Sequence, residues 1–199
     1  MEYKFILVSS SIRRIELLRK LGLKFLIISP KTTEIYHLNK DPCHIAILNA
    51  LRKMNSIERK EMDNAILIAA DTLIVVDNEI IGKPKNVDDA KNILKKLSGK
   101  WHHVYTGLVV KVKGRVYTDC CITKVKFKEL TEKEIDFYVE TGEPLDAAGA
   151  YKIQGLASIF IENIQGPYDN VVGLPLNRLY VLLSKAGIDL IDVLKKSGS

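Results

Sequence analysis

Hydrophobic runs alternate with amphipathic stretches along the whole chain, and this alternation predicts interleaved strands and helices. Short apolar runs predict strands over 5–8, 25–28, 66–76, 79–84, 103–112, 116–127 and 159–161. Apolar residues at helical spacing predict helices over 12–21, 44–57 and 87–97. A capping box of Thr131 and Glu134 predicts another helix over 131–140, and Pro175 fits the first turn of a last one over 174–185. This order predicts an α/β fold with a mixed sheet, in a single domain over residues 1–199.

Asp71 interrupts the apolar run 66–76, and its carboxylate is expected to be buried with the rest of that strand. A buried carboxylate is costly unless it is paired, hydrogen-bonded or bound to a metal. A two-residue turn at 77–78 would fold the strand back as a hairpin, and counting back from that turn sets Thr72 opposite Lys83. Asp71 is therefore a candidate for chemistry, and a structural Asp–Lys ion pair is the alternative.

Three serines at 9–11, followed by Arg13 and Arg14, connect the first strand to the first helix. Arginines in the first turn of a helix oppose the positive end of its dipole unless an anion binds there. Backbone N–H groups, the Ser9 hydroxyl and a guanidinium fork together could form a phosphate cradle. An ordinary serine cap with two solvated arginines is the alternative.

Three more residues carry weaker signals. Glu34 could be a second carboxylate near Asp71, giving the oxygen ligands that Mg²⁺ prefers, or simply an exposed acid. Lys53, assigned to the polar side of the helix 44–57, fits a phosphate contact or a solvated lysine. Gln154 lies in a loop of small residues and could read a base edge through its donor and acceptor, or brace the loop.

The charge of the chain is unevenly distributed. Its formal net charge is +6, and the first 60 residues hold 12 Lys and Arg against 5 Asp and Glu. Such an excess can steer phosphates toward a site, or it can be a solvated surface without a partner. Trp101 and the tyrosines are not interleaved with basic residues, so the pattern does not favour nucleic-acid binding.

The composition, 47% hydrophobic and 27% charged, excludes a disordered chain, a collagen and a coiled coil. The apolar stretches are far shorter than the roughly 20 residues that cross a bilayer, which predicts no membrane span. Cys43, Cys120 and Cys121 make an odd count, and adjacent cysteines rarely pair with each other. The reducing cytoplasm is therefore the expected compartment.

Several short motifs occur together in one order along nearly the whole chain. They are Ser9-Ser10-Ser11-Ile12-Arg13-Arg14 with Glu16-Leu17-Leu18, Glu34, Ala50-Leu51-Arg52-Lys53, Ala70-Asp71-Thr72, Gly82-Lys83-Pro84, Leu97-Ser98-Gly99 with His102, Thr106-Gly107, Gly149-Ala150-Tyr151-Lys152-Ile153-Gln154-Gly155 and Val171-Val172-Gly173-Leu174-Pro175. On these motifs the chain resembles the Maf family of nucleoside triphosphate pyrophosphatases. The combination is far more specific than any single motif.

The resemblance implies hydrolysis of a nucleoside triphosphate at the α–β phosphate bond, giving a monophosphate and pyrophosphate with Mg²⁺ or Mn²⁺. It implies that Asp71 is the proton acceptor and that Glu34 and Asp71 bind the metal. Phosphate-binding positions implied in this sequence are Ser9, Arg13, Arg14, Lys53 and Lys83. Arg13, Thr72 and Gln154 match the positions that mark the branch acting on dTTP and UTP. The implied fold is an elongated, twisted mixed sheet flanked by helices, with a cleft between two lobes, and the implied assembly is a homodimer.

The sequence departs from the family pattern at Ile12, Met54 and Ala147, where a proline, an alanine and a lysine are usual. Ala147 is the important departure because it removes a cation from the expected site. Two alternatives to dTTP/UTP hydrolysis stay open. One is a pyrophosphatase for a modified nucleotide such as 7-methyl-GTP, and the other is a non-catalytic regulator of cell division that binds nucleotide or nucleic acid.

Overall fold

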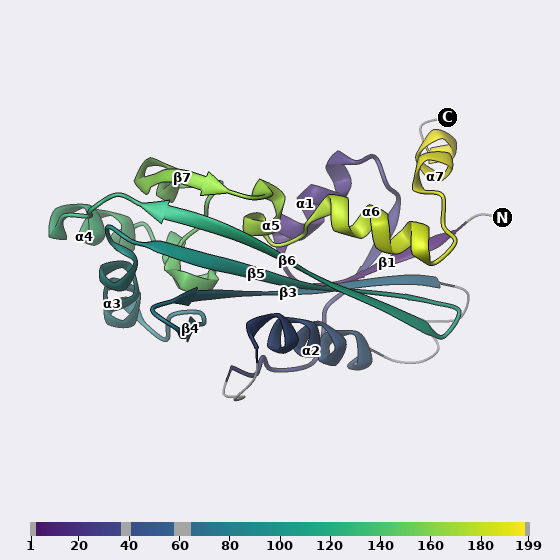
Figure 1. Ribbon diagram of the computed structural model, residues 1–199, viewed down its shortest axis with the longest axis horizontal. Coiled ribbons are helices and arrows are strands. Elements are labelled where there is room, and N and C mark those ends of the chain that lie inside the picture. The colour runs from purple at the N-terminus through teal and green to yellow at the C-terminus, as the bar shows by residue number, and fades with distance from the viewer. Residues whose placement is uncertain (1–2, 37–40, 58–64, 198–199) are drawn as a thin grey trace. The chain divides into compact units, whose positions relative to one another are not determined.

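The computed structural model describes residues 3–36, 41–57 and 65–197 (Figure 1). Its strands are β1 (Lys4–Val8), β2 (Phe25–Ile28), β3 (Ala65–Val76), β4 (Glu79–Ile81), β5 (Trp101–Val112), β6 (Arg115–Phe127) and β7 (Ile161–Gln165). Its α-helices are α1 (Ile12–Lys20), α2 (Pro42–Asn55), α3 (Val87–Leu97), α4 (Glu132–Glu140), α5 (Tyr168–Val172), α6 (Leu176–Lys185) and α7 (Leu190–Ser197). None of the helices in these ranges is long and apolar enough to span a membrane.

The strands within the described ranges form one seven-stranded mixed sheet. Its order is β2-β1-β3-β5-β6-β7, with β4 paired to β3. β1 runs parallel to both β2 and β3, whereas β4 runs antiparallel to β3 and β7 antiparallel to β6. The predicted mixed α/β fold is therefore confirmed.

The chain divides into two compact units. Unit 1 comprises residues 1–71, 106–121 and 173–199, and unit 2 comprises residues 72–105 and 122–172. Three strands, β3, β5 and β6, therefore contribute residues to both units. The single domain over 1–199 and the cleft between two lobes stay predictions.

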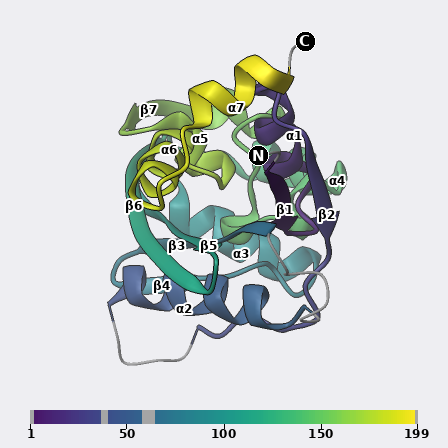
Figure 2. The same ribbon diagram turned by 90° about the vertical axis from the view of Figure 1, so that its right-hand side faces the viewer.

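Unit 1 has buried apolar side chains on both faces of its strands. One cluster joins alternate strand residues to α2 and comprises Ile6, Val8, Ala50, Met54, Ile57, Ala65, Leu67, Ala69 and Val109. The intervening residues Phe5, Leu7, Ile66 and Ile68 are buried as well. Figures 1 and 2 show α2 on one side of these strands and α1 and α6 on the other. Covering on both faces explains why the strands are continuous apolar runs in the sequence.

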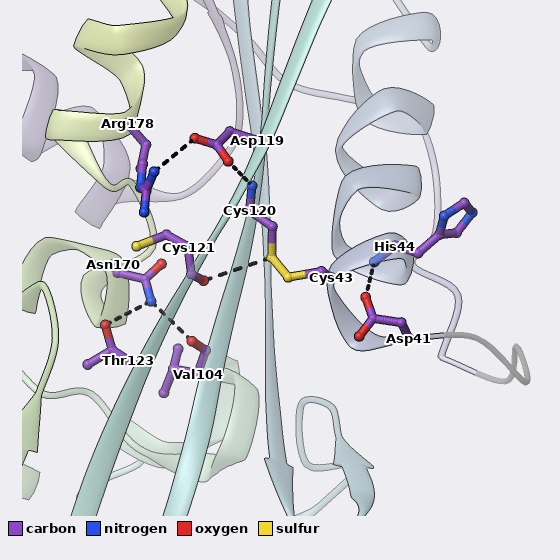
Figure 3. The surroundings of a disulfide bond; sticks show 10 residues. All are labelled: Asp41, Cys43, His44, Val104, Asp119, Cys120, Cys121, Thr123, Asn170 and Arg178. Atoms are coloured by element: carbon purple, nitrogen blue, oxygen red, sulfur yellow. Dashed lines mark hydrogen bonds and ion pairs between the residues drawn. A yellow bond between two sulfur atoms is a disulfide. The ribbon is translucent and has the colours of Figure 1, made fainter.

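Helix α2 is held against the strands of unit 1 at two points. A side chain at Gly107 of β5 would overlap the peptide between Ala46 and Ile47, so glycine permits backbone-to-backbone packing there. A disulfide joins Cys43 in the first turn of α2 to Cys120 of β6 (Figure 3), with 5.6 Å between the two Cα atoms. The cysteine analysis of the sequence did not anticipate this bond. Among the described residues, Cys121 is the cysteine outside this disulfide, and it is buried.

Unit 2 packs around an aromatic cluster. The His102 ring lies 5.2 Å from Phe127 and 5.4 Å from Tyr151, centroid to centroid, and Tyr138 lies 5.4 Å from Phe160. His102 Nε2 and the Tyr151 hydroxyl are hydrogen-bonded at 2.8 Å. These rings anchor the long loop after α4, which contains three short 3-10 helices, Glu143–Asp146, Ala148–Ala150 and Leu156–Phe160.

The hairpin between β3 and β4 has the predicted turn but is shorter than predicted. Asp77 and Asn78 both have positive φ, and Val76 pairs with Glu79. The pairing runs back only to Ile74 and Ile81, where β4 ends. The predicted opposition of Thr72 and Lys83 is therefore not part of this ladder.

Other differences lie at the ends of elements. α2 begins two residues before the predicted start because the Asp41 side chain caps it and Pro42 occupies its first position. β7 covers 161–165 instead of 159–161, because residues 156–160 form a 3-10 helix. The short helices α5 and α7 were not predicted. The predicted capping box at Thr131 is confirmed.

Candidate active site

Asp71 is a buried carboxylate near the middle of β3, as predicted, and only 1% of its surface is exposed. Its Oδ1 accepts a hydrogen bond from the Lys53 ammonium, and its Oδ2 accepts one from Asn49 Nδ2 at 3.0 Å. Both donors come from α2. The lysine bonded to Asp71 is thus Lys53 of α2, which the hairpin count did not consider.

Lys53 bridges two carboxylates. Its Nζ also lies 2.6 Å from Glu34 Oε1. The sequence analysis put Lys53 on the polar side of this helix, but its side chain is buried on the face of α2 that packs against the strands, so the alternative of a solvated lysine was wrong. Glu34 is half-buried, with its side chain 24% exposed, and its Oε2 accepts a hydrogen bond from the Tyr36 hydroxyl. The predicted proximity of Glu34 and Asp71 is thus present in unit 1.

Asn49 is a residue of this cluster that the sequence analysis missed. It is 1% exposed and lies one helical turn before Lys53. Besides its bond to Asp71, Asn49 binds both backbone groups of Ile35, accepting from its N–H at 2.9 Å and donating to its carbonyl at 3.0 Å. A signal was available: Ile45, Asn49 and Lys53 follow one another at four-residue spacing on a helix.

The two carboxylates have pKa values displaced in opposite directions. Burial raises the pKa of Asp71 above its ordinary value, although the charges of Lys53 and Arg14 oppose this. Burial acts in the same sense on Glu34, but the charge and hydrogen bond of Lys53 and the Tyr36 hydroxyl lower its pKa to about 2. Glu34 therefore stays ionised, and Asp71 is the carboxylate that takes up a proton more readily.

Arg14 adds a second buried cation to unit 1. Its Nε donates to the Gly173 carbonyl at 2.7 Å, which fixes the guanidinium, and it is 8% exposed. Burial lowers the pKa of Arg14, while the nearby charges of Asp71 and Glu34 raise it. The sequence motif thus brings Arg14 into the electrostatic field of both acids.

The other residues of the serine–arginine motif begin α1. Ser9 is buried and its Oγ accepts from the Ser11 N–H at 3.1 Å, while Arg13 is half-buried. Ser11 occupies the N-cap position without a side-chain capping bond, so the alternative of an ordinary serine cap is wrong for this residue. The first turn also contains no acidic residue.

Three predicted residues belong to unit 2. Thr72 on β3 is half-buried, and Lys83 and Gln154 are exposed. Ala147, which stands where the family has a lysine, is completely buried. The nearby Lys152 forms an ion pair with Asp146 at 2.6 Å.

The cluster in unit 1 has the chemistry of a cation site. The ammonium of Lys53 already lies between oxygens of Glu34 and Asp71, which shows that a positive charge fits there. No group of three His, Cys, Asp or Glu that could hold a metal occurs in the described parts of the chain. Two carboxylates can nevertheless hold Mg²⁺ when substrate phosphates and water supply the remaining oxygens.

Residues 4–186 match the family described as Maf-like protein. A protein of Dictyoglomus thermophilum named dTTP/UTP pyrophosphatase is 43% identical over 194 residues, covering 96% of this chain and all of that protein. Proteins with the same name from Thermosipho melanesiensis and Bacillus cereus are each 45% identical, over 89% and 94% of this chain and 95% and 97% of theirs.

Two solved structures resemble the fold. They are a HAM1 protein from Coxiella burnetii, with a TM-score of 0.50, and the Staphylococcus aureus Ham1 protein, with a TM-score of 0.52. Each is 13% identical and covers 92% of this chain and 99% of its own. At this identity the likeness concerns the fold alone.

Proposed function

The chain belongs to the Maf family, and from this premise we propose that it hydrolyses dTTP and UTP at the α–β phosphate bond, releasing a nucleoside monophosphate and pyrophosphate. The names of the curated relatives, which match nearly the whole chain, support this reaction. The observation that carries the proposal is the cluster in unit 1 of buried Lys53 and Asp71 with half-buried Glu34. Charged side chains are costly to bury, so a function is needed to explain them. In phosphate transfer, carboxylates can take up a proton or bind a metal, and cations stabilise the phosphate charge.

Asp71 acts as the proton acceptor in this proposal. Attack of water on the α-phosphate releases a proton, and a general base must take it. The opposite pKa displacements of the two acids support assigning this role to Asp71, since a carboxylate with a raised pKa is the better base. Glu34 remains the permanent anion of the pair.

The cations of unit 1 neutralise the triphosphate. Charge builds up on the pyrophosphate leaving group as the α–β bond breaks, and fixed cations in a water-poor site stabilise it. Arg14 is fixed by its bond to Gly173, and Lys53 by its two carboxylates. Ser9, Arg13 and Lys83 complete the proposed phosphate contacts.

Glu34 and Asp71 would hold a divalent cation, Mg²⁺ or Mn²⁺, together with phosphate oxygens of the substrate. Bound there, the cation would polarise the phosphate that is attacked. The Lys53 ammonium would then share the two carboxylates with it, because each carboxylate has about four lone-pair positions.

Base selection is assigned to Arg13, Thr72 and Gln154. Gln154 is exposed, and the paired donor and acceptor of its side-chain amide suit one edge of a pyrimidine. A homodimer and a cytoplasmic location remain expectations. Nucleic acid and membranes are not among the proposed partners.

The test is pyrophosphate release from dTTP, UTP, GTP and 7-methyl-GTP, with Mg²⁺ or Mn²⁺, by the purified protein. The proposal requires dTTP and UTP to be the best substrates. A preference for 7-methyl-GTP would support the modified-nucleotide alternative. Salt-sensitive binding of nucleotide or nucleic acid without any hydrolysis would favour the regulator instead.

A further inference from the structure

Glu34 lies on a segment without regular structure. Residues 29–36 belong to no helix or strand, so no ladder of backbone hydrogen bonds fixes the position of this acid. A carboxylate on such a segment needs another support if it is to stay at a defined distance from Asp71.

Helix α2 provides that support. The Lys31 N–H donates to Ser56 Oγ, next to the end of α2, at 3.0 Å. Further along, Asn49 binds both backbone groups of Ile35, the residue after Glu34. The segment therefore runs along α2 in the opposite direction, and Glu34 comes to lie beside Lys53.

The orientation of the Asn49 amide follows from its partners. Ile35 N–H is a donor, so the oxygen of the amide must face it. The nitrogen then faces two acceptors, the Ile35 carbonyl and Asp71 Oδ2. A flipped amide would set its oxygen against both acceptors, and a leucine would supply none of these bonds.

We infer that Asn49 is a positioning residue, which clamps the segment carrying Glu34 to the carboxylate of Asp71 so that both acids keep one geometry toward the substrate. The inference rests on the proposed function, because that reaction defines why the two acids must be aligned. Asn49 itself reaches Asp71 and Ile35, and it acts on the substrate only through them.

The clamp can be tested without any turnover. In Asn49→Leu, the Ile35 amide loses its acceptor, so we expect it to exchange with solvent at least about tenfold faster by NMR. Amides within α2 should keep their protection. Asn55→Leu, an exposed position on the same helix, is the matched control and should leave the Ile35 exchange rate unchanged.

In the catalytic assay, Asn49→Leu should change kcat much more than KM. Misplacement of the two acids should lower kcat for dTTP by about 10- to 100-fold while KM changes less than about threefold, because the phosphate-binding cations remain. Asn49→Ser, which is too short to reach both partners, should behave in the same way. This variant keeps the test decisive if the leucine variant does not fold.

Two results would overturn the inference. One is an unchanged Ile35 exchange rate in a folded Asn49 variant, and the other is faster exchange with kcat within about twofold of the parent protein. If the parent protein hydrolyses no triphosphate, the proposed function fails. The exchange measurement still decides whether Asn49 holds the segment.

Discussion

The two units bury ionisable side chains in opposite ways. Unit 1 keeps Lys53 and Asp71 as a buried pair, with Arg14 beside them. Unit 2 buries His102 against Phe127 and Tyr151, where burial lowers its pKa to about 3 and keeps the ring neutral. A buried charge such as that of Lys53 or Asp71 is costly unless it is paired with an opposite charge. The neutral ring of His102 can instead pack as an aromatic residue does.

The difference indicates that the charged cluster of unit 1 is a binding site, whereas the aromatic cluster of unit 2 is part of a packed core. Replacing a buried ion pair by apolar residues is often neutral or stabilising, so stability alone does not explain the cluster in unit 1. The other buried residues of α2, apart from Asn49, are small or apolar, so this face of the helix could pack without charges. The burial of charged side chains in unit 1 is therefore best explained by a ligand that they bind. The burial of His102 is explained by its packing in the aromatic cluster.

Replacing Lys53 should lower the stability of the protein more than any other change considered below. Lys53→Met leaves Asp71 and Glu34 close together without their shared cation, so the free energy of unfolding at pH 8 should fall by about 3–5 kcal/mol. The loss should be smaller at pH 5. Without the ammonium, the folded state binds more protons than the unfolded chain, and its stability rises as the pH falls.

Urea unfolding at both pH values checks this prediction. Lys96→Met is the matched control, because Lys96 pairs with Glu79 on the surface, where water and salt screen the pair, and its loss should change stability far less. Equal losses in the two variants, or a loss in Lys53→Met that is independent of pH, would contradict the account.

Reduction of the disulfide should destabilise unit 1 in particular. The bond between Cys43 and Cys120 spans 77 residues of sequence, and a disulfide typically contributes about 2–4 kcal/mol, more for a long loop. We expect dithiothreitol to lower the unfolding free energy of the parent protein and to increase hydrogen exchange in α2 before α3. Cys43→Ser should be insensitive to the reductant, and an equal response of both proteins would show that the bond is not what reduction changes.

Acid should act on unit 2 through His102. Between about pH 6.5 and pH 3, the unfolded chain binds a proton that the buried ring does not bind. Stability therefore falls as the pH falls through this window, by at most about 1.4 kcal/mol per pH unit. His102→Phe should show a shallower dependence of unfolding free energy on pH than the parent protein, and His44→Phe, at an exposed position, should not. Identical slopes in the parent protein and His102→Phe would refute this.

Gln154→Ala should have the smallest effect. An exposed side chain contributes little to folding stability, so the midpoint of thermal unfolding of this variant should equal that of the parent protein. If Gln154 reads the base, the ratio of kcat/KM for UTP to that for GTP should fall by about tenfold, the value of one lost hydrogen bond. An unchanged ratio would remove Gln154 from the specificity residues.

The sequence predicted β1 and β3 of unit 1 well because these two strands are buried on both faces. Continuous apolar runs define β1 and β3 closely, and the Asp71 interruption identified the acid correctly as buried. The edge strand β7 was displaced in the prediction, because its residues are largely exposed and lack an apolar run. α5 is only five residues long, too short for periodicity to reveal it.

The face of α2 was misassigned for a physical reason. The sequence analysis assigned the buried face of this helix from large apolar residues such as Leu48 and Leu51. In the structure these two residues are only half-buried. The buried face instead uses the small residues Ala46 and Ala50, which let α2 approach the strands closely, and it carries the polar site residues. The Cys43–Cys120 bond depends on tertiary proximity across 77 residues, which no local pattern encodes.

The most direct test of the proposed chemistry compares Asp71→Asn with Asp77→Asn in the same pyrophosphate-release assay. Both changes remove one carboxylate from the chain, but Asp77 lies in the exposed β3–β4 turn. If Asp71 is the proton acceptor, Asp71→Asn should fold, as shown by circular dichroism, and lose about 10²–10⁴-fold in kcat for dTTP, while Asp77→Asn keeps full activity. A folded Asp71→Asn protein that releases pyrophosphate at the rate of the parent protein would contradict the central claim.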